Sequence, residues 1–533
     1  MRVSLLLTLL FALLPACSLT GIDQVEATPC ATTGTSDLTA AHATCAMELG
    51  GAPLGDCEAY VCALQIDDQL FCTVGAPDAD GDGVGEAACV PEGTEELRDC
   101  DDDDADIAEG RVEICDGKDN DCDGRTDEEL IRVTDPVLRD TADSASAYHV
   151  VGTATTGDHV TAAFRRDVAS NASLFVLAGD LPKVVSRPDG TSGDVRLDAP
   201  TTEDQDRGVA VGGDTDTTFV VFPGTGCSGL SAGSVNDPTS SSATLVSTAL
   251  DDNEGLPSTA SANRECTEAV DQRAAAVAVA GRDVMIAWLE SSRRGSCGTM
   301  ATAPLRVTAT TPEAQFGSAA TDLGTANDSG PPTLLALSMS DVFILAYGHE
   351  NEIVLSSLRQ TGGAIDILDT VRVNVGAPVE DLTLTAGPRG EETTTVAVAF
   401  SKGCGRSGEV GLQRAMVTRA GGMIREVGEP TMVDTGEAQV EPAVAFGVDS
   451  PRGYFIVWRE GDQQVRGQLL DEADGTSGSA VEIVAPAFIG GSADDRIRGI
   501  GVAAGTEGGF STLAYVNGAE TGFFESLVSC GAE

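Results

Sequence analysis

The stretch DVMIAW, from Asp283 to Trp288, is a short apolar strand that ends in an aromatic residue, and this pattern recurs along the chain. Seven such strands follow Leu130, and their terminal aromatic residues are Phe164, Phe222, Trp288, Tyr347, Phe400, Trp458 and Tyr515. The gaps between these residues are 58, 66, 59, 53, 58 and 57 positions. A period this regular indicates one structural unit repeated seven times.

Other short strands surround each of these segments. A small-residue strand precedes the aromatic strand, as in AAAVAVAG (Ala274 to Gly281), and two more follow it, as in QQVRGQLLD (Gln463 to Asp471) and SAVEIV (Ser479 to Val484). Four short antiparallel strands in each of seven repeats predict a seven-bladed β-propeller over residues 130–533. A string of β-sandwich modules is the alternative. We expect the seven aromatic residues to pack between blades as part of the core.

The two ends of the repeat region predict how the ring closes. The seventh repeat stops after FFESLVSC (Phe523 to Cys530), which is its third strand. A spare strand, LIRVTDPVL (Leu130 to Leu138), stands just before the first repeat. We expect this strand to complete the last blade, because a closed ring has no free edge at which other chains could pair.

Composition places the whole chain among mainly β proteins and makes it strongly acidic. Of the 533 residues, 41% are hydrophobic and only 4% aromatic, and glycine is abundant, which favours short strands joined by many turns. The formal net charge is −52. Such a chain repels the phosphates of nucleic acids, so no nucleic-acid partner is expected. The acidity serves solubility, or alternatively recruits a basic partner.

The densest acidity lies between Asp78 and Glu129, where 22 acidic and 4 basic residues give a formal charge of −18. Hard cations such as Ca²⁺ take six to eight oxygen ligands, and carboxylates at alternate positions of a tight loop can converge on one ion. Three such runs occur, two of them followed by glycine. Neither glycine-containing run has the acidic residue at position 12 that an EF-hand requires, so both resemble the shorter calcium loops of thrombospondin type 3 and dockerin-like repeats. The predicted ligands are Asp78, Asp80, Asp82, Glu86, Asp99, Asp101, Asp103, Asp104, Asp119, Asp121, Asp123 and Asp127.

The string DCDDDDADIAEGRVEICDGKDNDCDGRTDEE, from Asp99 to Glu129, resembles a metal-binding motif of bacterial extracellular proteins, many of them myxobacterial. The motif is named after the copper protein MopE. Glu109 replaces its usual proline and Arg111 its usual alanine, whereas the cysteines, the aspartates and both CDG turns match. The name suggests copper, but Asp78 to Glu129 contains no His, Met or Trp. An all-oxygen ligand set favours calcium, so we predict structural calcium, with an ion-free acidic linker as the alternative.

The N-terminus predicts export and a lipid anchor. Arg2 precedes a largely apolar run of 12 residues, Val3 to Leu14, which is too short to span a bilayer and typical of a signal peptide. LPAC, Leu14 to Cys17, resembles a bacterial lipobox, with Pro15 at a position that is usually Ala or Ser. The resemblance implies lipidation at Cys17 and, with Ser18 next, an outer-membrane lipoprotein. An ordinary cleaved signal peptide is the alternative. The predicted domains are residues 1–17, a Cys-rich spacer 18–77, the metal-binding module 78–129 and the propeller 130–533.

The cysteine count favours a disulfide framework. Apart from Cys17 the chain has 14 cysteines, an even number in a chain expected to be exported. Five lie before the acidic stretch, four within it and five after it. Either one bridge therefore crosses between modules or two thiols stay free. The lack of any CxxC pair argues against zinc. Ser36 to Gly50 is predicted to be a short helix.

No motif in the chain makes a convincing catalytic site. Gly229 to Gly233 matches GxSxG, but a nucleophile elbow needs a helix after the serine, and a Gly/Ser-rich segment follows here, which we expect to be a loop. We expect no enzymatic activity. The expected function is that of a cell-envelope lipoprotein, anchored in the membrane by lipid, that binds calcium and presents a propeller to a protein or glycan. The alternative is a propeller hydrolase or lyase that acts on polysaccharide.

Overall fold

The computed structural model describes most of the chain, and the account below concerns the residues that it describes. They are residues 29–32, 38–48, 57–66, 69–89, 98–114, 118–123, 130–141, 148–156, 159–168, 171–177, 183–186, 196–197, 209–213, 218–223, 230–236, 243–245, 272–290, 301–311, 320–337, 340–362, 364–403, 408–433, 439–448, 452–461, 464–471, 480–484, 496–505, 509–517 and 522–530. Two compact units result. The first comprises Met1–Val112 and Asn120–Cys122, and the second Glu113–Asp119 and Asp123–Glu533. The predicted signal peptide and Cys17 lie outside the described residues.

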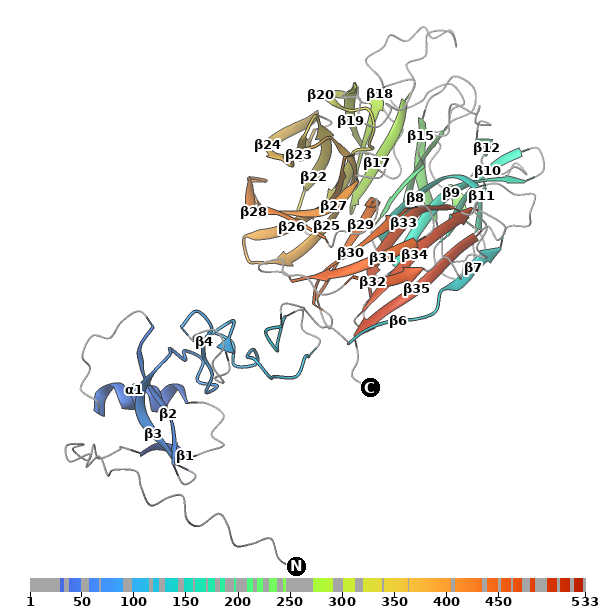
Figure 1. The fold of residues 1–533 in the computed structure, drawn as a ribbon. Coiled ribbons are helices and arrows are strands. Elements are labelled where there is room, and N and C mark those ends of the chain that lie inside the picture. Colours follow the sequence, from blue (N-terminus) through green and yellow to red (C-terminus); the bar gives the residue numbers. More distant parts are fainter. Residues whose placement is uncertain are drawn as a thin grey trace, which may run out of the picture. The chain divides into compact units, whose positions relative to one another are not determined.

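The second unit is a seven-bladed β-propeller, which confirms the predicted fold class (Figure 1). Blade 1 consists of β8 (Tyr148–Thr156), β9 (His159–Val168), β10 (Asn171–Leu177) and β11 (Lys183–Ser186). Blade 2 consists of β13 (Ala210–Gly213), β14 (Thr218–Pro223), β15 (Leu230–Asn236) and β16 (Ala243–Leu245). Blade 3 consists of β17 (Gln272–Ala280), β18 (Asp283–Glu290), β19 (Thr302–Thr310) and β20 (Thr321–Asn327). In blade 1, the short β12 (Arg196–Leu197) also pairs with β10. The outer strands β11 and β16 pair in parallel, which joins blades 1 and 2 into one sheet.

The remaining blades repeat the same order of strands from the centre outward. Blade 4 consists of β21 (Thr333–Ala336), β22 (Val342–His349), β23 (Glu352–Thr361) and β24 (Ala364–Asn374), and blade 5 of β25 (Val379–Arg389), β26 (Thr393–Lys402), β27 (Glu409–Thr418) and β28 (Ile424–Met432). Blade 6 consists of β29 (Gln439–Gly447), β30 (Gly453–Glu460), β31 (Gln464–Leu470) and β32 (Val481–Val484). Blade 7 consists of β33 (Arg496–Ala504), β34 (Phe510–Asn517) and β35 (Gly522–Cys530), together with β6 (Ile131–Val133) and β7 (Val137–Thr141).

The last blade is completed from the start of the propeller sequence, as the spare strand predicts. Val133 pairs with Val528 in β35, and Leu138 pairs with Phe524 further along the same strand. The backbone N–H of Thr134 donates to the carbonyl of Leu527 at 2.9 Å. Figure 1 shows the teal β6 alongside the red β35. This pairing leaves the outer edge of β35 covered rather than free.

The second strand of each blade carries the repeated aromatic residue, and all seven aromatic side chains are buried. In β18 every residue after Asp283 is buried, because both faces of a blade are covered by its neighbours in the ring. Such strands have continuous apolar runs instead of an alternating pattern. Phe164 of blade 1 lies 4.7 Å from Phe523 of blade 7, measured between ring centroids, and this contact lies at the closure of the ring. The prediction that the aromatic residues pack between blades is confirmed.

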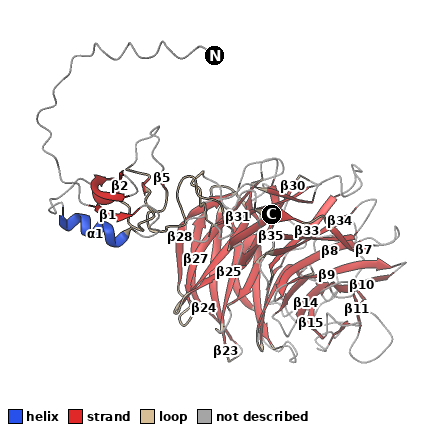
Figure 2. Ribbon diagram, turned by 90° about the horizontal axis from the view of Figure 1, so that it is seen from below, coloured by secondary structure: helices blue, strands red, loops and turns tan. Residues whose placement is uncertain are grey.

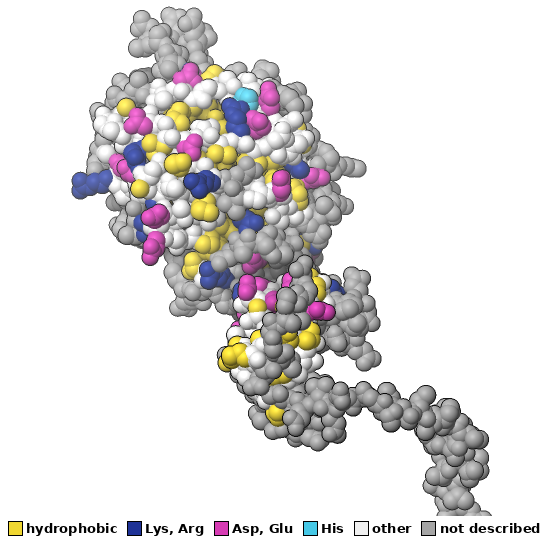
Figure 3. Space-filling view, turned by 90° about the vertical axis from the view of Figure 1, so that its left-hand side faces the viewer, with side chains coloured by type: hydrophobic (Ala, Val, Ile, Leu, Met, Phe, Trp, Pro, Cys, Tyr) yellow, Lys and Arg dark blue, Asp and Glu magenta, His cyan; other side chains and the backbone are white. Residues whose placement is uncertain are grey.

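The inner strands surround a central channel of 1710 Å³ that is lined mostly by small apolar residues, among them Val277, Ala278 and Val444. Neighbouring inner strands approach so closely that a Cβ at Gly212 would lie 2.4 Å from the carbonyl oxygen of Val277. Only glycine permits that approach. Figure 2 shows the blades from another side. On the face of the propeller drawn in Figure 3, acidic and basic side chains are interspersed.

The predicted GxSxG match has a different environment from the one expected. Leu230 to Gly233 lies within β15, the third strand of blade 2, instead of in a loop. Ser231 pairs with Phe222 of the neighbouring strand. Small residues fit there because blades pack face to face in the ring. A serine in the middle of a sheet lacks the strand-to-helix turn of a nucleophile elbow, so the match carries no catalytic meaning.

The first unit is small and held by disulfides. Helix α1 (Thr39–Glu48) packs on a sheet with the order β1 (Pro29–Thr32), β3 (Gln69–Gly75), β2 (Ala59–Ile66), and β4 (Gly85–Glu86) pairs in parallel with β5 (Arg98–Asp99). The predicted helix exists and starts at Thr39. Four disulfides join Cys30 to Cys62, Cys45 to Cys72, Cys57 to Cys89 and Cys100 to Cys122. Cys115 lies outside the described residues.

One of the four disulfides crosses between two of the predicted modules. Cys57 belongs to the predicted spacer and Cys89 to the predicted metal-binding module, so their bridge is one that crosses between modules. Cys30, Cys45 and Cys72 lie close enough to hold a metal ion, but all three sulfur atoms are in disulfides and are not thiolate ligands. Within the described residues, no helix is long and apolar enough to cross a membrane.

Candidate metal centre

The first acidic run forms a compact group of carboxylates in the first unit. Oxygen atoms of Asp78, Asp80 and Asp82 all lie within 4.8 Å of one another. The loop that presents them is held by its own side chains, since Asp78 Oδ1 accepts the N–H of Gly81 at 2.8 Å and Asp80 Oδ1 accepts the N–H of Asp82 at 3.0 Å. These bonds are the Asx-type turns that favour aspartate in tight loops. The run therefore brings three carboxylates together, as the sequence predicts.

Helix α1 supports this loop from behind. The backbone N–H of Leu38 donates to the carbonyl of Gly81 at 2.8 Å, and the Thr39 hydroxyl donates to the carbonyl of Asp80 at 3.1 Å. Gly81 has φ +79°, and a Cβ there would lie 2.5 Å from the backbone nitrogen of Thr39. Glycine is therefore required both by the backbone conformation and by the close approach of the helix.

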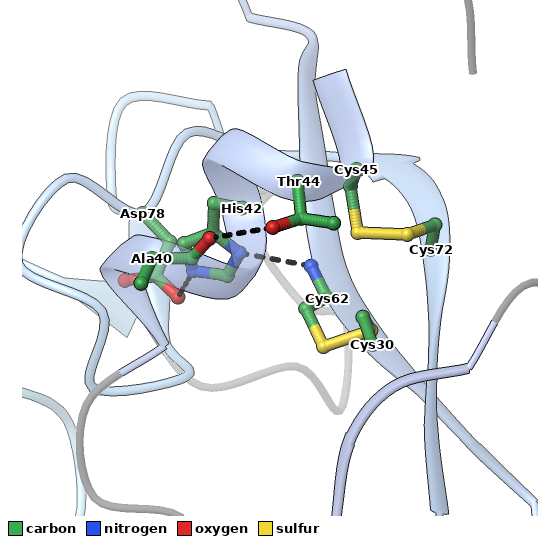
Figure 4. The surroundings of a disulfide bond; sticks show 8 residues. All are labelled: Cys30, Ala40, His42, Thr44, Cys45, Cys62, Cys72 and Asp78. Atoms are coloured by element: carbon green, nitrogen blue, oxygen red, sulfur yellow. Dashed lines mark hydrogen bonds and ion pairs between the residues drawn. A yellow bond between two sulfur atoms is a disulfide. The ribbon is translucent and has the colours of Figure 1, made fainter. Parts of the chain in front are cut away.

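His42 connects the carboxylates to the disulfide-linked sheet (Figure 4). Its Nδ1 accepts the backbone N–H of Cys62 at 2.8 Å, so Nδ1 carries no proton. Its Nε2 lies 2.8 Å from Asp78 Oδ2 and donates the ring proton to it. The imidazole is thus neutral and holds Asp78 in place without offsetting its charge. No metal motif in the sequence points to this role, because His42 is 36 positions away from Asp78.

The second acidic run contributes two carboxylates to the same place. Asp99 is 1% exposed and ends β5, which lies beside β4 next to the first loop. Asp102 Oδ1 accepts the backbone N–H of Ala79 at 2.9 Å, so it reaches directly into that loop. Buried Asp80 Oδ2 and Asp99 Oδ2 have no hydrogen-bond partner in the described part of the chain. A buried carboxylate oxygen without a partner is costly unless a cation or proton satisfies it.

The pKa values of these carboxyls reflect burial and mutual repulsion. Burial, together with the charges of Asp82 and Asp78, raises the pKa of Asp80 to about 6 from its ordinary 3.8. Burial, with the charges of Asp80 and Asp82, raises the pKa of Asp99 to about 7. The pKa of Asp102 is also raised, first by burial and then by the charges of Asp78 and Glu86. A cation that binds here relieves the repulsion and replaces the protons.

The other predicted ligands lie in different positions. Asp101 and Asp103 are exposed, whereas Asp102 between them points into the cluster and was not among the predicted ligands. Asp102 belongs to the run Asp101 to Asp104, but the prediction chose the alternate positions Asp101 and Asp103 together with Asp104, and so left Asp102 out. Asp104 accepts the N–H of Asp106 at 3.2 Å and closes a turn. Glu86 and Asp99 stand opposite each other in the backbone register of the parallel strands β4 and β5.

The residues of the third predicted run are divided between the two units. Asp121 belongs to the first unit, whereas Asp119 and Asp123 belong to the second. Asp119 Oδ1 accepts the N–H of Asp123 at 3.1 Å. Asp127 lies outside the described residues. The carboxylates that the first unit brings together are therefore Asp78, Asp80, Asp82, Asp99 and Asp102.

The chemistry of this donor set fits a hard cation. Every group is a carboxylate, two buried oxygens lack a partner, and the neighbouring imidazole is neutral. Hard divalent ions prefer oxygen ligands of this kind, whereas copper prefers imidazole and sulfur. Among the described residues of this stretch, Cys89, Cys100 and Cys122 are in disulfides and cannot coordinate as thiolates. The cluster therefore has the composition of a centre for a hard, oxygen-bound metal ion.

The raised pKa values predict how pH affects the ion-free first unit. Because the folded pKa values of Asp80 and Asp99 exceed the ordinary value, the protonated carboxyls stabilise the fold at acid pH, and this stability is lost as pH rises through about 6 and about 7. With chelator present, the melting temperature of this unit should fall between pH 4.5 and pH 8. Calorimetry measures it. Asp99→Asn should flatten the curve, and a melting temperature that rises with pH in the wild type would contradict the expectation.

Comparisons with known proteins agree with the resemblance of Asp99 to Glu129. A family model described as "Putative metal-binding motif", which bears the name of MopE and copper, matches residues 99–128. The match includes Asp99 and Asp102 but not the first loop. It covers a small part of the chain, so the motif is one feature of the protein. No curated protein matches the chain.

Several solved structures are similar to this chain, at low sequence identity and low TM-score. A protein of unknown function from Dyadobacter fermentans is 10% identical, with a TM-score of 0.41, and the match covers 76% of this chain and 100% of that one. A fucose-specific lectin from Aleuria aurantia is 10% identical, with a TM-score of 0.36, covering 65% of this chain and 99% of that one. A Trypanosoma rangeli sialidase is 10% identical, with a TM-score of 0.37, covering 65% and 57%. At these identities and TM-scores, no property of this chain is inferred from the likeness.

Proposed function

We propose that this chain is a non-enzymatic cell-envelope lipoprotein that binds calcium through the aspartate cluster and presents its propeller to a protein or glycan. The observation that carries the calcium part is the pair of buried, unpartnered oxygens, Asp80 Oδ2 and Asp99 Oδ2, among carboxylates that repel one another. Asp78, Asp82 and Asp102 would supply the other protein ligands. The lipid anchor at Cys17 rests on the N-terminal sequence.

Calcium is favoured over other hard ions by the nature of the cluster. Calcium accepts six to eight oxygen ligands in flexible arrangements, whereas magnesium demands near-ideal octahedral geometry and keeps several waters. Here the carboxylates come from two loops, and several already accept backbone N–H groups that restrict their movement. A large ion tolerates such a set more readily than a small one does. Extracellular calcium modules typically have Kd values of about 10⁻⁴–10⁻³ M.

The role of the ion would be structural. Asp78, Asp80 and Asp82 come from one loop, and Asp99 and Asp102 come from the segment that follows β4, so one ion would join the two. Helix α1 and the Cys57–Cys89 disulfide already hold the first loop. A bound ion would attract all of these carboxylates and so offset their mutual repulsion. In the sequence, the first unit lies between the proposed lipid anchor and the propeller. A bound ion would make this unit rigid.

Calorimetric unfolding of the full chain in millimolar calcium or in chelator tests this proposal. An ion that binds only the folded state adds about 2.7 kcal/mol of stability at a hundredfold excess over its Kd. We expect calcium to raise one transition, that of the first unit, and to leave that of the propeller unchanged. The variant Asp80→Asn/Asp99→Asn should lose the shift, whereas Asp103→Asn, at an exposed position, should keep it. Identical unfolding in calcium and chelator would refute the calcium centre.

The remaining parts of the proposal have their own measurements. Incorporation of labelled fatty acid into the chain expressed in a Gram-negative host, and its loss in Cys17→Ser, test the anchor. Binding of the full chain to arrayed glycans, together with release of reducing sugar from the glycans it binds, tests the propeller. Binding without release supports a presenting role, whereas steady release of sugar would favour the hydrolase alternative.

A further inference from the structure

One of the five carboxylates already has a cationic partner within the chain. The Arg111 Nη2 atom lies 2.5 Å from Asp82 Oδ2, and the Asp82 side chain is only 1% exposed. Its other oxygen, Oδ1, accepts the backbone N–H of Val84 at 2.7 Å. Both oxygens of Asp82 are therefore engaged, in contrast to the unpartnered Oδ2 atoms of Asp80 and Asp99.

We propose that Arg111 is a built-in counter-cation which a divalent ion must displace from Asp82, so that Arg111 sets the affinity of the metal centre. This inference rests on the calcium centre proposed above. In the ion-free state the guanidinium offsets part of the charge of the cluster. In the ion-bound state Asp82 Oδ2 becomes a ligand and the guanidinium moves into solvent.

The surroundings of Arg111 permit this exchange without unfolding. Its side chain is 42% exposed, so it already lies at the border of the cluster and can be hydrated by a rotation of its own bonds. Its backbone N–H bonds the carbonyl of Ala108 at 3.0 Å, which holds the main chain while the side chain moves. A Cβ built at Gly110 would meet no atom within 4 Å, so the space beside the turn is open.

The charges set the direction of the exchange. Arg111 carries one positive charge and bonds one carboxylate, while a divalent ion carries two and can bond several carboxylates at once. The charges of Asp106 and Asp80 also favour the cationic form of Arg111. The arginine therefore competes with the ion for the same negative charge. Ion binding must break the Arg111–Asp82 hydrogen bond, and the energy of that bond is subtracted from the binding energy of the ion.

The test is an isothermal titration of CaCl₂ into the full chain, with three variants as comparisons. Arg111→Ala should bind calcium about tenfold more tightly, because a charged hydrogen bond at a partly exposed position contributes at the lower end of its usual range. Arg111→Lys, which keeps the charge but loses the planar fork, should fall between Arg111→Ala and the wild type. Arg282→Ala removes the same charge from an exposed turn of the propeller and should leave the affinity unchanged.

A second readout separates competition from mere loss of structure. In chelator, Arg111→Ala should lower the melting temperature of the first unit, because the ion-free cluster loses its counter-charge. In saturating calcium the same variant should melt at or above the wild-type temperature. A variant damaged in folding would melt lower under both conditions.

The possible outcomes distinguish the two proposals. Calcium binding in the wild type with equal or weaker binding in Arg111→Ala overturns the counter-cation and leaves the calcium centre standing. No binding heat in either protein overturns both. Equal tightening in Arg111→Ala and Arg282→Ala would show a general effect of net charge, which also overturns the specific role of Arg111.

Discussion

Replacing Trp458 with alanine is expected to lower the free energy of unfolding of the propeller by about 3–5 kcal/mol, the usual cost of removing a fully buried aromatic side chain. Trp458 lies in β30 and is 0% exposed. It belongs to a cluster that includes Ala399 and Leu412 of the preceding blade, so its ring fills space between two blades. The cavity left by the substitution would therefore weaken both the core of the blade that contains Trp458 and its contact with the preceding blade.

Chemical denaturation of the full chain measures this change, and two variants make it specific. Trp458→Phe should cost much less, because it keeps an aromatic ring and removes an indole N–H that has no acceptor among the described residues. Met423→Ala, at a side chain that is 52% exposed, should change stability by less than about 0.5 kcal/mol. A loss below about 1 kcal/mol for Trp458→Ala would show that the ring is not at a packed blade interface.

Removing the Cys57–Cys89 disulfide by a double change to serine is expected to cost about 3–4 kcal/mol of stability in the first unit. The two cysteines are 32 positions apart, and a cross-link that closes a loop of that length restricts the unfolded chain by about this amount. The same change should weaken calcium binding, because Cys89 follows directly on the segment that carries the first loop and β4. Calorimetry with and without calcium measures both effects.

A second disulfide gives the matched comparison. Cys45 and Cys72 are 27 positions apart, so removing their bridge should cost nearly as much stability. That bridge joins α1 to β3 and does not touch the segment Asp78 to Cys89, so its removal should alter calcium affinity less than the loss of Cys57–Cys89 does. Non-reducing peptide mapping should recover one peptide pair joined through Cys57 and Cys89. Free thiols at both positions in the wild type would contradict the pairing.

The propeller was predictable because its signal is periodic and local. Strands such as β18 and β30 are buried on both faces, so each of them is a continuous apolar run that is recognisable without knowledge of its neighbours. Their regular spacing indicated seven copies, and the missing strand after Cys530 pointed to the spare strand at Leu130. The segment Leu230 to Gly233 was harder to interpret, because small polar residues suit a loop and a crowded strand equally well.

The metal centre was only partly predictable for a corresponding reason. Alternate aspartates in one tight loop are close in space because they are close in sequence, so Asp78, Asp80 and Asp82 could be grouped correctly. The selection of Asp102 over Asp101 and Asp103 depends on how the second segment lies against the first, which no local pattern states. The support from His42 is equally non-local, since a helix and a disulfide-linked strand bring it to Asp78.

By itself, the sequence determined the class of fold, the number of blades, the strand that closes the ring and the oxygen-rich character of the metal-binding stretch. These properties follow from periodicity and composition, which act over a few neighbouring residues. Only the tertiary structure decided which aspartates share one cluster, which cysteines pair, and that Arg111 bonds Asp82. These contacts join segments that are distant in the chain. Their geometry depends on how the segments pack together, and a local sequence pattern does not specify that packing.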